Sequence, residues 1–258
     1  MNFRLQFGLV FIFLVLNIAE SSAWGPQGHR VIGFIAESHL KPEVRQLIAE
    51  KFNINSLADV ATWADKVRKK RKREGTWHYT NIEAGQGAYD ADRDCPKKAC
   101  VTEKINEFSR VLADRSVAVK KRKDALKYLV HFVGDVHQPL HLGNKKDRGG
   151  GTLHFPYKGK LVSLHYLWDG GLLDWGGTSL LEYATRLNSR LPEVSSWNTS
   201  SVSDWANESR RLALATAYQV DKEGLSKSYI KKSRDILNLR LTQAGVRLAN
   251  LLNTLLTF

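Results

Sequence analysis

Apolar residues recur at intervals of three and four along most of this chain, and this period limits the possible folds more than any other feature of the sequence. Residues spaced in this way share one face of an α-helix. The same period occurs before Leu40, around Val44 and between Leu126 and Val133, whereas strand-like alternation is scarce. We therefore predict a mostly α protein with a long C-terminal helix packed on the core. The apolar stripe of that helix is Leu237, Leu241, Ala244, Leu248, Leu251 and Leu255.

The remaining composition is that of one globular domain. The chain has 258 residues, of which 43% are hydrophobic and 25% charged, and no repeat or linker divides it. We expect a single helical domain over residues 24–258. The Gly-rich stretch 148–151 is followed by alternation at Leu153, Phe155 and Tyr157, which permits at most a short β-hairpin. Because this stretch follows a His-rich helix, we expect it to form a wall of a site.

Residues 1–23 have the pattern of a signal peptide. Arg4 precedes an apolar run from Leu5 to Leu16, and the small residues 21–23 suit a signal peptidase. The run is short for a membrane span, and no later stretch reaches about 18 apolar residues. We expect cleavage before Trp24, a secreted or periplasmic protein, and no membrane anchor.

The chain contains two cysteines, Cys95 and Cys100, in a loop-like segment. In an exported chain an even number of cysteines favours disulfide pairing. We therefore expect one local disulfide bond, which stabilises a turn.

The charge balance is strongly positive. Lysine and arginine number 39 against 26 aspartate and glutamate, a formal net charge of +13, which favours polyanionic partners. The densest stretch, Lys66–Arg73, has seven basic residues in eight. The alternative is a solvated helix face, but such a face normally includes acidic residues. We interpret this stretch as a segment that faces an anion.

Histidines and carboxylates occur together at helical spacing. His131 and Asp135 are four apart, as are His165 and Asp169, so each pair shares a helix face. One such pair is commonly structural, but two pairs with further histidines and an aspartate exceed what packing explains. Imidazole and carboxylate ligands without cysteine suit zinc in a hydrolytic site. The further candidates are His29, Asp65, His78 and His141.

Three other histidines have simpler explanations. His39 ends the first amphipathic stretch and is expected at the surface or at a helix end. His137 is two residues beyond Asp135 and so points about 200° away from it on a helix. His154 lies in the Gly-rich segment and either lines a pocket or is exposed. None of the three is expected to bind metal.

Seven motifs follow one another along the predicted mature chain. They are WGPQGH from Trp24, TWAD ending at Asp65, WHYTN ending at Asn81, HFVGDVHQPLH from His131, LHYLWD ending at Asp169, WANES from Trp205 and AGVRLANLLN from Ala244. Together they resemble the zinc-dependent, single-strand-specific nuclease family, whose members are bifunctional nucleases and 3′-nucleotidases. That family is distantly related to bacterial zinc phospholipase C and shares its helical fold.

The resemblance implies three zinc ions per chain and divides the candidate ligands among them. The first zinc is assigned Asp65, His78, His131 and Asp135, and the second His141, His165 and Asp169. The third takes the α-amine and carbonyl of Trp24 together with His29, and Asp135 bridges it to the first. A free α-amine has a pKa near 8, low enough for a metal to displace its proton.

The resemblance also assigns roles around the zinc ions. Asp65 lies near the attacking water, and Arg68, in the family's WADxxR pattern, stabilises phosphate charge; an exposed basic residue is the alternative. Tyr79 and Phe155 either stack on bases or belong to the core.

Two positions depart from the family pattern. Asn81 stands where many members have Asp, and Gly151 stands where the GGN motif ends in Asn. Both positions contribute to base recognition in the family, so its base preference is not carried over.

The expected function is hydrolysis of single-stranded RNA and DNA to 5′-phosphorylated products by a monomer that also accepts 3′-nucleotides. One alternative is a zinc phospholipase C acting on lipid headgroups, which the charge of +13 disfavours. The other is a non-catalytic basic nucleic-acid-binding protein, which the complete ligand spacing disfavours.

Overall fold

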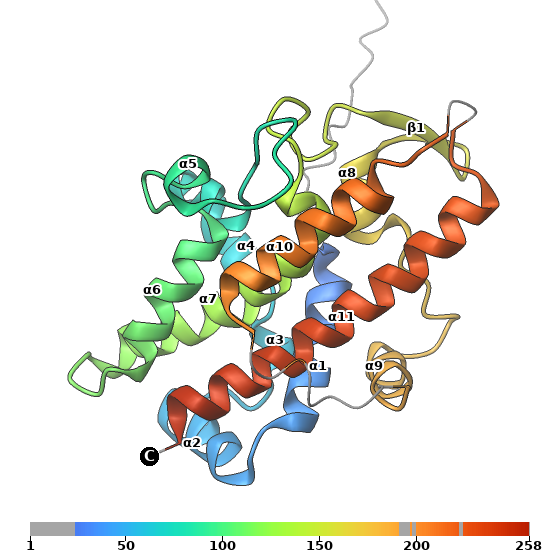
Figure 1. Ribbon diagram of the computed structural model, residues 1–258. Coiled ribbons are helices and arrows are strands. Elements are labelled where there is room, and N and C mark those ends of the chain that lie inside the picture. The colour runs from blue at the N-terminus through green and yellow to red at the C-terminus, as the bar shows by residue number, and fades with distance from the viewer. Residues whose placement is uncertain (1–23, 191–196, 198–199, 222–223, 258) are drawn as a thin grey trace, which may run out of the picture.

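The computed structural model describes residues 24–190, 197, 200–221 and 224–257, so the expected signal peptide lies outside the described residues. The described chain is mostly helical and contains one two-stranded sheet, which confirms the predicted fold class (Figure 1). In chain order the elements are α1 (Gly25–His39), α2 (Pro42–Phe52), α3 (Leu57–Val60), α4 (Trp63–Arg68), η1 (Lys72–His78), α5 (Ala91–Asp94), α6 (Val101–Ala113), α7 (Val119–His137), η2 (Pro139–Leu142), β1 (His154–Tyr157), β2 (Lys160–Ser163), α8 (Leu164–Tyr166), η3 (Leu167–Gly171), α9 (Leu180–Asn188), α10 (Val202–Leu212), η5 (Ala213–Ala217) and α11 (Lys227–Leu256).

The predicted long C-terminal helix is α11, with 30 residues. Its N-cap Ser226 accepts a hydrogen bond from the first turn, as capping residues do. The first four residues of the predicted stripe are completely buried. Leu251 and Leu255 are only half-buried, and Leu252 and Leu256 take the fully buried positions where the end of α11 packs against α2 (Figure 1).

Helix α7 is the central helix of the fold. Thirteen of its 19 residues are buried, including every residue from Tyr128 to His137. A helix is buried all round only where neighbours cover every face, and here α6, α10, α11 and α1 pack against it. In Figure 1, α10 and α11 lie in front of α7. Side chains at the C-terminal end of α7 therefore point into the interior of the protein.

Helix α1 crosses α7 at Gly134. A Cβ atom there would lie 2.9 Å from Nδ1 of His29 and 3.0 Å from Cδ1 of Ile32. Such distances leave no room for a side chain, so glycine permits the close approach of the two helices. This crossing brings the ring of His29 against α7.

The predicted short hairpin is confirmed as β1 and β2. The two strands are antiparallel, with His154 opposite Ser163 and Tyr157 opposite Lys160. The turn consists of Lys158 and Gly159, with φ angles of 49° and 75°. Positive φ at both central residues matches the twist of a two-residue hairpin.

Cys95 and Cys100 form a disulfide bond just before α6, as expected. Among the described residues, no helix combines the length and the apolar character needed to cross a membrane.

Candidate metal centre

The end of α7 presents His131 and Asp135 on one face, as their spacing predicts. Nε2 of His131 lies 3.3 Å from Oδ2 of Asp135, and both side chains are completely buried. Nδ1 of His131 is 2.7 Å from the carbonyl oxygen of Ala61. Because a carbonyl can only accept a hydrogen bond, Nδ1 carries the proton, and the lone pair of Nε2 faces the carboxylate.

Asp65 of α4 and His78, the last residue of η1, join this pair. Nδ1 of His78 lies 3.0 Å from Oδ2 of Asp135 and 3.1 Å from Nε2 of His131. Oδ1 of Asp65 lies 3.7 Å from Nε2 of His131 and 3.9 Å from Nδ1 of His78. Four candidate ligands from three elements thus direct nitrogen or oxygen atoms toward one point.

The other oxygen of Asp135 faces His29. Nε2 of His29 lies 3.3 Å from Oδ1 of Asp135, and its ring stacks on that of His131 with 3.8 Å between centroids. Trp24 lies beside them, because its indole Nε1 donates a 2.6 Å hydrogen bond to the carbonyl of Gly134 and its side chain is completely buried. Asp135 therefore divides its two oxygens between two groups of candidate ligands.

A separate group consists of His141, His165 and Asp169, from η2, α8 and η3. Nε2 of His165 lies 3.4 Å from Oδ2 of Asp169, and Nε2 of His141 lies 3.8 Å from Oδ1. Both rings donate Nδ1–H to a carbonyl at 2.7 Å, that of His78 for His141 and that of Gly149 for His165. Each ring therefore keeps Nε2 for the group.

The Gly-rich segment before β1 supports His165. The backbone is left-handed at Arg148, Gly149 and Gly150, with φ of 55°, 63° and 79°. A Cβ atom on Gly149 would lie 2.3 Å from the carbonyl oxygen of Leu140 and 3.1 Å from Nδ1 of His165. Position 149 therefore requires glycine, because a side chain there would collide with the backbone of Leu140 and with the His165 ring that the Gly149 carbonyl orients.

Our sequence reasoning missed Gln138, which follows α7 and is completely buried. Its Nε2 donates a 2.6 Å hydrogen bond to Oδ1 of Asp169, and its Oε1 accepts one from the amide of Leu140. The side chain therefore fixes the direction of a candidate ligand 31 residues away. Its position between Asp135 and His141 in the motif HFVGDVHQPLH was the available signal.

Burial controls the protonation of these groups. It lowers the pKa of His131 and places that of His141 well below its usual range, and with the neighbouring His131 it also lowers the pKa of His78. Burial raises the pKa of Asp135 well above its usual range. Neutral imidazoles are ready to bind a metal, whereas a buried carboxylate needs a positive charge beside it. Oδ1 of Asp135 has no hydrogen-bond partner among the described residues, so the donor set fits a cation.

All eight histidine and aspartate candidates fall into three groups, and within each group the ligand atoms lie within 4.8 Å of one another. The groups are His29, His131 and Asp135; Asp65, His78 and His131; and His141, His165 and Asp169. The third group equals a predicted set, whereas the other two differ from prediction: His131 also lies within reach of His29, and Asp135 is grouped with His29 and not with Asp65 and His78.

Arg68 lies at the edge of this cluster, one helical turn after Asp65 on α4. Its Nε is 3.2 Å from Oδ1 of Asp65, and its side chain is 21% exposed. The guanidinium therefore contacts a candidate ligand and is also accessible from outside.

Asn81 lies on an extended segment next to His141. The amide of Thr80 donates to the carbonyl of His141 at 2.8 Å, and that of Ile82 donates to Gly143 at 2.9 Å. Asn81, between them, is half-buried, and its side chain makes no hydrogen bond to another described residue. The backbone on both sides of Asn81 is therefore bonded to the segment that begins at His141.

Gly151, Tyr79 and Phe155 are also half-buried. Gly151 follows the segment that supports His165, and Tyr79 directly follows His78. Phe155 packs against the hydrophobic core. Tyr79 and Gly151 therefore each lie next to a residue of the metal centre or its support, whereas Phe155 pairs with Val162 in the hairpin.

The three histidines set aside in the sequence analysis lie outside the groups. His39 bonds through Nε2 to Asn188 at 2.7 Å, and His137 is buried with its Nε2 2.9 Å from Nη1 of Arg247. His154 is exposed.

Comparison with known proteins shows that the whole of the described chain is similar to one family of nucleases. The family model described as S1/P1 nuclease matches residues 24–257. Endonuclease 3 of Arabidopsis thaliana is 29% identical, with 98% of this chain and 96% of that protein covered. Endonuclease 2 of the same plant is 27% identical, with 95% and 94% covered. Nuclease S1 of Aspergillus oryzae is 29% identical, with 88% and 89% covered.

Proposed function

The chain belongs to the S1/P1 nuclease family, and from this membership we propose that it is an exported enzyme with three zinc ions that hydrolyses single-stranded RNA and DNA to 5′-phosphorylated products. We include 3′-nucleotides among its substrates. The observation that carries the proposal is the set of three buried histidine–aspartate groups, two of which share His131. Because all eight of these residues belong to one chain, we propose that it acts as a monomer.

The proposed ligand sets follow the observed groups. Asp65, His78, His131 and Asp135 hold the first zinc, and His141, His165 and Asp169 hold the second. His29 holds the third together with the amine and carbonyl of Trp24, and Asp135 is a ligand shared between the third zinc and the first. The division of the two Asp135 oxygens between His29 and His78 supports this bridging role.

Bound zinc supplies concentrated positive charge beside the phosphate and makes water more acidic. The side chains of Asp65 and Arg68 position the water and the phosphate. Asp65, which is 8% exposed, accepts a hydrogen bond from the attacking water and so aims it at phosphorus. Arg68 donates hydrogen bonds to the phosphate oxygens, where negative charge grows in the transition state. Its 3.2 Å contact with Asp65 keeps the two groups side by side.

We also propose that residues 1–23 are a signal peptide removed before Trp24. The family match begins at residue 24, which supports this boundary. Any residue left ahead of Trp24 converts its amine to an amide that cannot ligate as an amine. A chain with one extra N-terminal methionine should bind fewer zinc ions and turn over more slowly than the mature chain, and equal zinc content in both proteins would refute the role of Trp24.

Zinc quantification and product analysis on the same preparation test the proposed function. We expect three zinc ions per chain, and cleavage of single-stranded DNA and RNA and of a 3′-mononucleotide that stops on chelation. Phosphatidylcholine serves as the competing substrate. Hydrolysis of phosphatidylcholine without cleavage of nucleic acid would establish a phospholipase, and a protein without zinc that binds but does not cleave would establish a binding protein.

A further inference from the structure

The basic segment Lys66–Arg73 lies between two candidate metal ligands. Asp65 directly precedes it, and His78 follows five residues after its end. Because Asp65 and His78 both lie in the metal centre, the segment begins beside that centre and ends within five residues of it. The ligand sets include no residue of this segment, and Arg68 is the one residue of the segment to which the proposed function gives a role.

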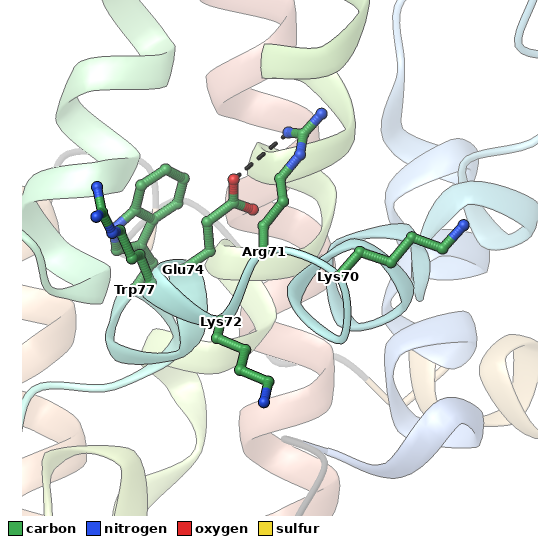
Figure 2. Close-up of a pocket in the computed structure, with 6 residues that line it drawn as sticks. Lys70, Arg71, Lys72, Glu74 and Trp77 are labelled. Atoms are coloured by element: carbon green, nitrogen blue, oxygen red, sulfur yellow. Dashed lines mark hydrogen bonds and ion pairs between the residues drawn. The ribbon is translucent and has the colours of Figure 1, made fainter.

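The second half of the segment borders an open hollow of about 600 Å³. In Figure 2, Arg71 and Glu74 face each other, whereas Lys70 and Lys72 extend away from this pair. Lys70, Lys72 and Arg73 are all exposed. The residues that line the hollow are Lys70, Arg71, Lys72, Arg73, Glu74 and Trp77.

Glu74, the acidic residue that lines the hollow, already interacts with neighbouring side chains. Glu74 is buried, accepts a 2.6 Å hydrogen bond from the hydroxyl of Tyr128 and lies 3.4 Å from Nη1 of Arg71. Lys70, Lys72 and Arg73 form no ion pair with another described residue. A solvated helix face normally has acidic residues three or four positions from its basic ones. These three cations instead remain available to an anion from outside.

The aromatic residue of the hollow is not a free stacking platform. Nζ of Lys104 lies over the ring of Trp77, 4.4 Å from its centroid. Phe108 and Tyr128 pack against the same indole, with centroids 6.0 Å and 5.8 Å away. The hollow therefore offers positive charge without a surface for a base, which suits backbone phosphates and no particular base sequence.

We propose that Lys70, Lys72 and Arg73 bind the phosphates of the substrate strand beyond the bond that is cleaved. The enzyme then holds long single strands more tightly than short ones, whatever their sequence. This inference rests on the proposed function, because it assigns the segment to the same substrate.

The test compares two variants with the same change in charge. The control cations lie at the start of α7, at least eight residues before His131, about 12 Å along the helix. The test variant is Lys70→Gln, Lys72→Gln and Arg73→Gln, and the control is Lys120→Gln, Lys121→Gln and Lys123→Gln. Cleavage of oligothymidylates of increasing length, from the dinucleotide to about twenty nucleotides, is measured as kcat/KM at several salt concentrations, with zinc content checked in both variants.

We expect the loss in the test variant to grow with substrate length and to reach at least about tenfold for the longest strand at low salt. For three contacts, the slope of log kcat/KM against log salt for the longest strand should become shallower by about 2, since each neutralised single-strand phosphate contributes about 0.7 to binding. The control variant should follow the wild type apart from a small change common to all lengths.

Two results would overturn the inference. One is a loss that is independent of length or equal to that of the control. The other comes from a parallel assay of binding to phosphatidylserine vesicles. If the wild type binds these vesicles and the test variant does not, while the test variant still cleaves long strands normally, the segment is a membrane-facing surface. A wild type that cleaves no oligonucleotide of any length would instead refute the proposed function itself.

Discussion

Four candidate ligands of the metal centre, His131, His141, His165 and Asp169, depend on a neighbour that sets their direction. His131, His141 and His165 each donate Nδ1–H to a backbone carbonyl at 2.7 Å, and the amide of Gln138 donates to Asp169. A ring turned the other way would put its N–H in the centre, where a cation would repel it. Such contacts therefore decide whether a buried residue can act as a ligand, and losing one typically costs 10–100-fold in metal affinity.

Replacing Gln138 with leucine removes the hydrogen bond that fixes Asp169. We expect zinc affinity of the group formed by His141, His165 and Asp169 to fall about 10–100-fold while the other sites keep their zinc. Titration against a chelating dye measures both affinity and number of sites. Gln46→Leu is the matched control, because the exposed side chain of Gln46 bonds to Glu50 on the surface of α2, far in sequence from the candidate ligands. Equal zinc affinity in the two variants would show that Gln138 does not position Asp169.

The ligands could be predicted from the sequence, but their orientation could not. Histidine and aspartate at four-residue spacing form a recognisable pattern, and His131 with Asp135 and His165 with Asp169 lie as that pattern implies. The orienting carbonyls of Ala61 and Gly149 are invisible in a sequence, because every residue has a carbonyl. Gln138 was missed because one buried amide has no period and no fixed partner.

Among the helices and strands, the long helices could be predicted from the sequence and the short elements could not. Helices α1, α7 and α11 were predicted because an apolar period is visible over several turns. The short elements η1, η2, α8 and η3 have between three and seven residues, too few for a period to appear. These short elements nevertheless carry His78, His141, His165 and Asp169, so the sequence identified the ligands without the elements that position them.

The crossing of α1 and α7 should not tolerate a side chain at Gly134. In Gly134→Ala the new methyl group meets the ring of His29, at 2.9 Å, and Ile32, at 3.0 Å. We expect a loss of about 1–3 kcal/mol in unfolding free energy and a lower occupancy of the zinc site that contains His29. Calorimetry and zinc quantification measure the two effects. Gly87→Ala, where a Cβ meets nothing within 4 Å, should leave both unchanged, and the same result for Gly134→Ala would disprove close packing at the crossing.

Helices α10 and α11 are joined by an ion cluster around Glu208. Arg240 donates to Glu208 at 2.6 Å, and Arg247 donates through both terminal nitrogens at 2.6 Å and 2.8 Å. Burial opposes ionisation of Glu208, but the two guanidinium groups outweigh it and lower the pKa of the carboxyl. Arg240 also donates to the carbonyl of His137 at 3.1 Å, so the cluster holds the end of α7.

This ion cluster should make the free energy of unfolding depend on pH in the acidic range. Because the pKa of Glu208 is lower in the folded chain, its contribution is complete above the unfolded value, near pH 4.5, and is lost as pH falls below it. We expect Glu208→Gln to cost about 3 kcal/mol at neutral pH, with the difference from wild type shrinking below about pH 4. Denaturant unfolding across pH measures this difference. Glu50→Gln, at an exposed site, should show no such change, and a constant penalty for Glu208→Gln would contradict the ion cluster.

For the whole molecule, the metal centre joins parts of the chain that are distant in sequence. Its histidine and aspartate candidates extend from His29 to Asp169 and come from seven elements. Helices α10 and α11 contribute none of these ligands, yet they cover α7, which carries two of them. The single domain and the helical class could be predicted from the sequence, because they follow from its composition and from the spacing of its apolar residues. The crossing angles of the helices were not, because they depend on contacts such as that at Gly134.

Removing the metal should therefore weaken the fold as a whole. A site whose ligand is present at 1,000 times its Kd adds about 4 kcal/mol to the stability of the folded state, and each kcal/mol shifts Tm by about 2–4 °C in a domain of this size. We expect chelation to lower Tm by at least about 10 °C and added zinc to restore it, as calorimetry with EDTA followed by excess zinc can measure. Asp135→Asn removes the shared carboxylate, so its Tm should respond less to EDTA. A wild-type Tm that EDTA leaves unchanged would mean that the buried groups stabilise the fold without a cation, and that Asp135 is held neutral by burial alone.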